Sequence, residues 1–322
     1  GAGSGGKMVD AFATLSVVDL LVDDDLTVTG SVAVTGDYSS ATSGTSNLRL
    51  GVNAGNSIAS GGNFNTVVGD EAGTAITTGD YNTAVGMDSA KAITTGIKNT
   101  AIGSTALDAE VAGNYSTAIG MGALTTQSQS GDVDVYNTAV GYLAGGAVTT
   151  GTENTLIGGL AGDAITTGNY NVAIGKSALD LETAGHQSVA IGLQALSTQN
   201  NTSSTNAYNV AVGSQAGKLL TTGIRNTLIG GLAGDAITDA DYNIAIGYGS
   251  LGANTVGSGS IAIGNDSLGN QNPSSAGTMY NVAVGNNAGN GITTGVENTL
   301  IGALAGDALT DADYNVAVGA GA

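Results

Sequence analysis

The most numerous ionisable groups in this chain are carboxylates, and two short acidic clusters occupy equivalent places. Asp239–Asp241 and Asp311–Asp313 both read Asp-Ala-Asp, and a tyrosine follows each. Closely spaced carboxylates can hold Ca²⁺, but the calcium motif of β-rolls, Gly-Gly-x-Gly-x-Asp, is missing. Earlier copies of the same turn read Thr-Gly-Asn-Tyr and Thr-Gly-Ile-Lys, so the turn does not require acids. We expect solvated acidic turns here, with a calcium site as the alternative.

Other chemical motifs are equally isolated. His186 is the only histidine and there is no cysteine, so one chain can build neither a zinc site nor a catalytic triad. We expect a solvated turn residue, the alternative being three copies meeting on a symmetry axis. Gly247–Gly252 matches the glycine-rich phosphate loop, but no helix follows, as that loop requires. The Thr-Thr-Gly columns, as at Thr77–Thr78 and Thr166–Thr167, lack the flat Thr-x-Thr face of ice-binding solenoids.

No nucleophile–base pair or carboxylate pair recurs beside a supporting cleft. The sequence therefore predicts no enzyme and no catalytic, cofactor-binding or metal-binding residues. Polysaccharide depolymerases built on β-solenoids remain the alternative.

Composition and charge argue against further classes of function. The 322 residues include 54 Gly, one Pro, two Phe and no Trp, so the apolar content is mainly Ala, Val and Ile. Such small side chains suit a thin, repetitive core. The formal charge of −19 and seven scattered bases argue against nucleic acid as a partner, and no apolar run is long enough for membrane insertion. Residue 1 is Gly, so we expect a processed product or part of a longer chain.

The elements that must position any site come from an internal repeat. A glycine closes each Ala-Val-Gly or Ala-Ile-Gly phrase, and we call it the marker glycine. Successive markers are 17, 17, 17 and then 21 residues apart, which makes a 72-residue superperiod of four units. The markers are Gly69, Gly86, Gly103, Gly120, Gly141, Gly158, Gly175, Gly192, Gly213, Gly230, Gly247, Gly264, Gly285, Gly302 and Gly319. A degenerate unit ends at Gly51.

Each unit predicts one coil of a β-solenoid. The phrase Asn-Thr-Ala-Val-Gly alternates like a strand, the glycine permits a bend with positive φ, and x-Ala-Ile-Thr-Thr-Gly suggests a second strand. Stacked about 4.8 Å apart, about 16 coils would form a rod of roughly 75 Å, with Val and Ile columns inside. Asparagines would form a ladder, namely Asn82, Asn99, Asn137, Asn154, Asn171, Asn209, Asn226, Asn243, Asn281, Asn298 and Asn315.

Two regions are expected. Residues 1–46 show strong period-2 alternation in part and read as a β-rich shaft or adaptor segment. Residues 47–322 carry the repeats.

The repeats resemble known families. Phrases such as Asn-Thr-Ala-Val-Gly and Ser-Val-Ala-Ile-Gly look like the head repeats of trimeric autotransporter adhesins, the YadA-like repeats. The longer form, Asn-Thr-x-Ile-Gly-x-x-Ala-Gly-x-x-x-Thr-Thr-Gly, looks more like the repeats of phage tail-fibre proteins. The resemblance implies a left-handed parallel β-roll, association as a homotrimer and contact with other virion or fibre proteins. It also implies a virion or extracellular location, and a structural fibre segment that presents a host-attachment surface.

The alternative is a bacterial surface adhesin that binds matrix or cells from the cell surface. In either case the fourth unit of each block carries an extended loop, at 125–135, 197–207 and 269–279. These loops are polar and differ from one another, and surface loops on rigid scaffolds often carry recognition. They are candidates for binding a host glycan or protein receptor, the alternative being drift in unconstrained loops. We expect deletion of all three to abolish attachment without changing thermal stability.

Overall fold

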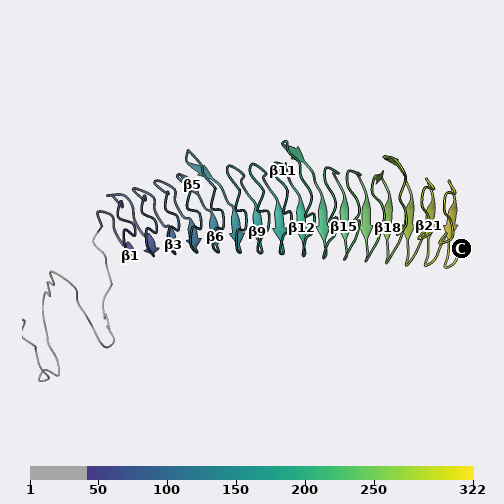
Figure 1. The fold of residues 1–322 in the computed structure, drawn as a ribbon, viewed down its shortest axis with the longest axis horizontal. Helices are drawn as coiled ribbons and strands as arrows, with labels where there is room; N and C mark the ends of the chain where they lie inside the picture. The colour runs from purple at the N-terminus through teal and green to yellow at the C-terminus, as the bar shows by residue number, and fades with distance from the viewer. Residues whose placement is uncertain (1–41) are drawn as a thin grey trace, which may run out of the picture. The chain divides into compact units, whose positions relative to one another are not determined.

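The structure, a computed structural model, describes residues 42–322. The predicted shaft or adaptor segment, 1–46, lies outside the described residues except for its last five positions. Residues 42–322 form one stack of short coils (Figure 1), all β and without any helix in that range. The predicted β-solenoid of about 16 coils is therefore confirmed.

Sixteen three-residue strands, one from each coil, form a single parallel sheet that runs the length of the stack. Neighbouring strands pair without slippage, so that Thr83 lies beside Thr100 and Thr100 beside Thr117. The strands are β1 (Leu48–Leu50), β2 (Thr66–Val68), β3 (Thr83–Val85), β4 (Thr100–Ile102), β6 (Thr117–Ile119), β8 (Thr138–Val140), β9 (Thr155–Ile157), β10 (Val172–Ile174), β12 (Val189–Ile191), β14 (Val210–Val212), β15 (Thr227–Ile229), β16 (Ile244–Ile246), β18 (Ile261–Ile263), β20 (Val282–Val284), β21 (Thr299–Ile301) and β22 (Val316–Val318).

The second strand predicted in every coil is wrong for most coils. The Thr-Thr-Gly segments make isolated backbone bonds, such as that from the Thr149 N–H to the Thr166 carbonyl at 2.9 Å, and no continuous ladder. Second strands occur only where a long loop returns to the stack. They are β5 (Gly113–Asn114) with β7 (Val133–Asp134), β11 (Gly185–His186) with β13 (Thr205–Asn206), and β17 (Gly257–Ser258) with β19 (Gly277–Thr278).

The marker glycines follow the strands at points where only glycine fits. Gly158 has φ of +132°, which L side chains rarely adopt. A Cβ added to it would lie 2.6 Å from the carbonyl oxygen of Gly175, the marker of the next coil. The repeat thus places backbone directly on backbone at this corner of every coil.

The predicted asparagine ladder is confirmed, and all of its members except Asn315 are buried. The Nδ2 group of Asn154 donates to the Gly168 carbonyl within its own coil at 2.9 Å. Its Oδ1 atom accepts the backbone N–H of Asn171 in the next coil at 3.0 Å. Asn47 and Asn65, at the start of the stack, extend the same column. Each side chain therefore closes one coil and holds its neighbour.

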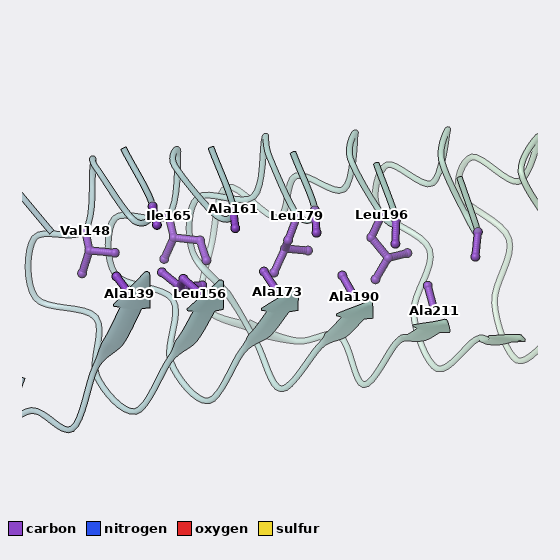
Figure 2. Close-up of a cluster of buried hydrophobic side chains, with 14 of the residues drawn as sticks. Ala139, Val148, Leu156, Ala161, Ile165, Ala173, Leu179, Ala190, Leu196 and Ala211 are labelled. Carbon is purple, nitrogen blue, oxygen red and sulfur yellow. The ribbon is translucent and has the colours of Figure 1, made fainter. Parts of the chain in front are cut away.

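The predicted interior is partly wrong. In a three-residue strand only the central side chain points inward, so the core row is Ala139, Leu156, Ala173, Ala190 and Ala211, with Val148, Ile165, Leu179 and Leu196 facing it (Figure 2). The Val and Ile before each marker glycine lie on the outer face of the sheet instead. The prediction held for the Ile of the Thr-Thr-Gly segments, which are buried.

The corner geometry predicts that substitution by alanine has very different effects on stability at two adjacent glycines. Gly158→Ala should lower the free energy of unfolding by about 1–3 kcal/mol from backbone strain alone, because its φ is positive and the next coil blocks its Cβ. Gly159→Ala is the matched control, since a Cβ there meets nothing within 4 Å. Its effect should stay within about 0.5 kcal/mol. Chemical denaturation of both variants measures this, and equal stabilities would contradict the close stacking.

Candidate functional site

Each 72-residue block contains four coils. The long loops arise where the interior is filled differently, in the third and fourth coils. First and second coils have Gly, or Ala in the case of Ala90, four residues after the marker and an aliphatic residue seven after it, as in Gly162 and Ile165. Third and fourth coils have Leu at the first place and a buried polar residue at the second. In the central block these are Leu179 with Glu182, and Leu196 with Gln199. At this position, seven residues after the marker, a polar side chain is buried only in the two coils of each block that lie next to the long loop.

Glu182 is fully buried, and within residues 42–322 its carboxylate is stabilised by hydrogen bonds rather than by an ion pair. Its Oε1 atom accepts the backbone N–H groups of Thr183, Gly185 and Asn201 at 2.8–3.0 Å. Its Oε2 atom accepts the side-chain amides of Gln199 and Asn201, at 2.7 and 3.0 Å. Buried charged groups are tolerated when their hydrogen-bonding capacity is filled in this way. The carboxylate thereby fixes the first residues of the long loop.

Gln199 replaces part of the asparagine column, because the fourth coil has Ser188 where other coils have Asn. The Gln199 Nε2 group donates to the Ser188 hydroxyl at 3.0 Å. Its Oε1 atom accepts from Nδ2 of Asn209, in the next coil, at 2.9 Å. Gln127 bonds Ser116 and Asn137 in the same way. The loop residue thus completes the ladder at the one coil whose own side chain is too short.

The third block departs from this arrangement at two positions together. Asn254 stands in place of the glutamate, and Pro273, the only proline, stands where Asn201 donates its backbone N–H. Since proline has no N–H, the donor and the carboxylate acceptor have been lost as a pair. Asn254 bonds Gly257 instead, and Nε2 of the buried Gln271 is left without a partner among the described residues.

The three long loops protrude from the same edge of the stack (Figure 1), where β5, β11 and the yellow-green loop between β18 and β21 stand out. Their tips, residues 130–132, 202–204 and 274–276, are exposed, whereas Gln127, Gln199 and Gln271 are buried. The loops therefore are not unconstrained at their bases. Deleting them whole would remove buried glutamines, so the expectation that thermal stability would not change is not supported by this geometry.

One open cavity of about 520 Å³ lies beside the central loop. It is lined by Asn200, Asn201, Thr202, Ser203, Thr205, Thr222, Ile224, Asp239 and Asp241. The loop at 197–207 and the acidic turn Asp239–Asp241 are both candidates from the sequence, and the structure brings them together. The turn belongs to a coil two layers further along the chain, and the stacking of the coils brings it next to the loop.

The acidic turn is partly structural. Oδ1 of Asp241 accepts the backbone N–H of Ile224 at 2.8 Å, and Oδ1 of Asp313 does the same for Val296. Asn169 fills this role in the equivalent turn one block before Asp241, where it accepts the backbone N–H of Thr152. No group of three or more His, Cys, Asp or Glu side chains positioned for a metal ion occurs within residues 42–322.

His186 is not the solvated turn residue that the sequence predicts. Its Nδ1 atom accepts the backbone N–H of Asn169 at 2.8 Å, which assigns the proton of the neutral ring to Nε2. Nε2 lies 2.8 Å from the hydroxyl of Ser204, so the ring braces the tip of the central loop. Gly247–Gly252 forms a marker corner and turn after β16, with no helix there.

Sequence reasoning missed a column of mostly exposed side chains, many of them aromatic. The residue before each buried asparagine has positive φ and projects outward, so its side chains follow one another along the stack. Phe64 stacks on Tyr81 with ring centroids 4.9 Å apart, and Tyr115 on Tyr136 at 5.1 Å. Their recurrence before Asn was visible in the sequence, but their exposure depends on a backbone conformation that the sequence does not reveal.

Comparison with protein-family models and with curated proteins finds no match to this chain. In the part of the chain that the structure describes, no helix is long and apolar enough to span a membrane.

The buried carboxylate gives a prediction about the loop base. Glu182→Ala should lower the free energy of unfolding by at least about 3 kcal/mol, because five donors lose their acceptor in a buried place. Exposed Glu153 provides the matched control, and Glu153→Ala should cost less than about 0.5 kcal/mol. Thermal and chemical unfolding of the two variants give the values. A similar small loss in both would show that the carboxylate does not hold the loop.

Proposed function

We propose that this chain is a structural fibre segment of a phage tail fibre, or of a similar virion appendage, and that it presents a host-attachment surface. The observation that supports this most is the placement of three divergent loops on one edge of a continuous parallel ladder (Figure 1). The ladder is uniform along its length, while the loops vary. Four coils separate successive loops, which corresponds to about 19 Å at the usual strand spacing.

The mechanism in this proposal is mechanical. Each coil contacts only its neighbours, as in other solenoids, and each contact combines strand pairing, the buried asparagine and the marker glycine. Bending such a stack requires these contacts to open together on one side. The rod therefore holds its loops at a constant spacing and orientation, as an attachment organelle requires.

Association into a homotrimer is also part of the proposal, and the outer face of the main sheet supports it. The third residue of all sixteen strands is Leu, Val or Ile, and the first is Leu, Thr, Val or Ile. This face therefore carries no charge in a chain of net charge −19. Ile102, Ile157 and Ile229 are 37–38% exposed. A long exposed apolar surface of this kind is typical of an interaction face, and the family resemblance suggests three copies.

The outer face predicts the oligomeric state. The wild-type chain should sediment as a trimer, and Ile157→Asp combined with Ile229→Asp should give monomers, because charges would enter the apolar interface. Thr95→Asp combined with Thr167→Asp is the control, since both threonines are exposed and Asp239 and Asp311 occupy the equivalent positions. Analytical ultracentrifugation distinguishes the species. A monomeric wild type, or an unaffected outer-face variant, would contradict the interface.

The attachment role is tested on particles. Antibody to this chain should label fibres in negative-stain images of virions, which places the protein on the virion surface. Label on the envelope of uninfected bacteria would overturn the proposal in favour of a surface adhesin.

Host attachment is tested with the loops. Replacing the exposed tips at 130–132, 202–204 and 274–276 with Gly-Ser-Gly should reduce adsorption of virions to host cells at least tenfold. The melting temperature should stay near that of the wild type, because the buried glutamines at the loop bases are kept. The control carries Gly159→Ala and the wild-type tips. Unchanged adsorption would remove the loops from the attachment surface.

A further inference from the structure

We propose that the cavity beside the central long loop binds a neutral saccharide. This inference rests on the proposed attachment function and names the chemistry of one of its contacts. The cavity of about 520 Å³ falls within the range of small-molecule sites, roughly 300–1,000 Å³. It is too small to accept a folded partner, but it suits one short segment of a glycan.

The lining supplies hydrogen-bonding groups suited to hydroxyls. Thr202, Ser203, Thr205 and Thr222 line the cavity, and a hydroxyl group can both donate and accept a hydrogen bond. Oδ1 of Asp239 accepts from the Thr238 hydroxyl and Oδ1 of Asp241 from the Ile224 N–H. The Oδ2 atoms of both residues accept no hydrogen bond from residues 42–322 and are free to accept one from a ligand. A sugar hydroxyl donated to such a carboxylate oxygen makes a charge-assisted bond, which is stronger than a neutral one.

The charge of the lining selects against acidic sugars. Two carboxylates and no lysine, arginine or histidine are among the nine lining residues. Arg225 is adjacent to Ile224 in the chain, but its guanidinium is bonded to the Tyr242 hydroxyl and lies over that ring. An anionic ligand would meet uncompensated negative charge. Ile224 provides the one apolar wall, against which the C–H face of a sugar ring can pack.

Hydrogen bonds to neighbouring residues orient the lining of the cavity before a ligand binds. Glu182 holds the backbone of Asn201, and Ile224 holds the Asp241 carboxylate. The Nε2 atom of His186 lies against the Ser204 hydroxyl at the loop tip. Because these groups are already oriented, binding a saccharide would require little ordering of the loop.

The chain offers variants that should keep the fold. Block-equivalent positions carry Thr167 and Asn169 in place of Asp239 and Asp241, and Asn169 accepts the same type of backbone N–H bond. Asp239→Thr combined with Asp241→Asn therefore removes both charges while using residues that this turn already accommodates. Asp311→Thr combined with Asp313→Asn makes the same change in the last block, outside the cavity.

The experiment uses the purified full chain with EDTA present, so that no metal ion bridges the contact. The probe is an array of neutral oligosaccharides of glucose, galactose, mannose and N-acetylhexosamines, together with sialylated and uronic-acid counterparts. Calorimetry with the best neutral binder follows. We expect neutral glycans to bind, the Asp239/Asp241 variant to bind at least tenfold more weakly, and the Asp311/Asp313 variant to match the wild type.

Three results would overturn the proposal, namely no neutral glycan bound, a preference for acidic glycans, or equal binding by the Asp239/Asp241 variant. Circular dichroism of each variant checks that the stack is intact. Failure of this inference is distinguishable from failure of the attachment function. If only this inference fails, antibody still labels the fibres and altered loop tips still reduce adsorption. If only the virion function fails, as for a surface adhesin, the chain still binds the glycan but virions carry no label.

Discussion

Every feature of this molecule depends on one constraint, that each coil must lie directly on a copy of itself. The marker glycines show it most clearly, because a Cβ on any marker from Gly51 to Gly302 would lie 2.3–2.7 Å from the carbonyl oxygen of the next marker. Backbone contact of this closeness leaves no room for a shift in register. The buried asparagines reinforce it, since each amide bonds one carbonyl in its own coil and one N–H in the next. These contacts explain why glycine recurs at the corner of every coil and asparagine in most coils, whether a coil has 17 or 21 residues.

The 72-residue superperiod also has a physical cause. Within a thin interior, Leu four residues after the marker fills the space that Ile fills from seven residues after it. When Leu179 and Leu196 take over the filling, the other position can be polar, and Glu182 and Gln199 occupy it. Their hydrogen bonds then secure a loop that leaves the stack and returns. The third block shows that the parts are coupled, because Asn254 and Pro273 replace the acceptor and the donor together.

The fold was predictable from the sequence because its evidence is periodic. Repeated Asn and Gly fix the number of coils, the parallel pairing and the places of the long loops. The interior was predicted less well, since a three-residue strand turns its Val and Ile outward and only its central Ala or Leu inward. Glu182 gave no signal in the sequence, as a single glutamate in a polar repeat reads as a surface residue. The cavity was hidden for a different reason. The loop at 197–207 and the turn Asp239–Asp241 were each visible, but their proximity arises from the stacking of coils two layers apart.

The same stacking decides what variation along the chain can achieve in the proposed attachment role. A substitution within a coil must fit that coil and the coils above and below it, so contacts in three coils constrain it. A substitution at a loop tip meets solvent and leaves the buried glutamine and asparagine contacts unchanged. Sequence change therefore concentrates at the loops, and the rod keeps their separation constant at about 19 Å. In this proposed role, three weak contacts held on one rigid edge would act together through high effective concentration. Different tips would then engage different parts of a host surface without any change to the ladder that carries them.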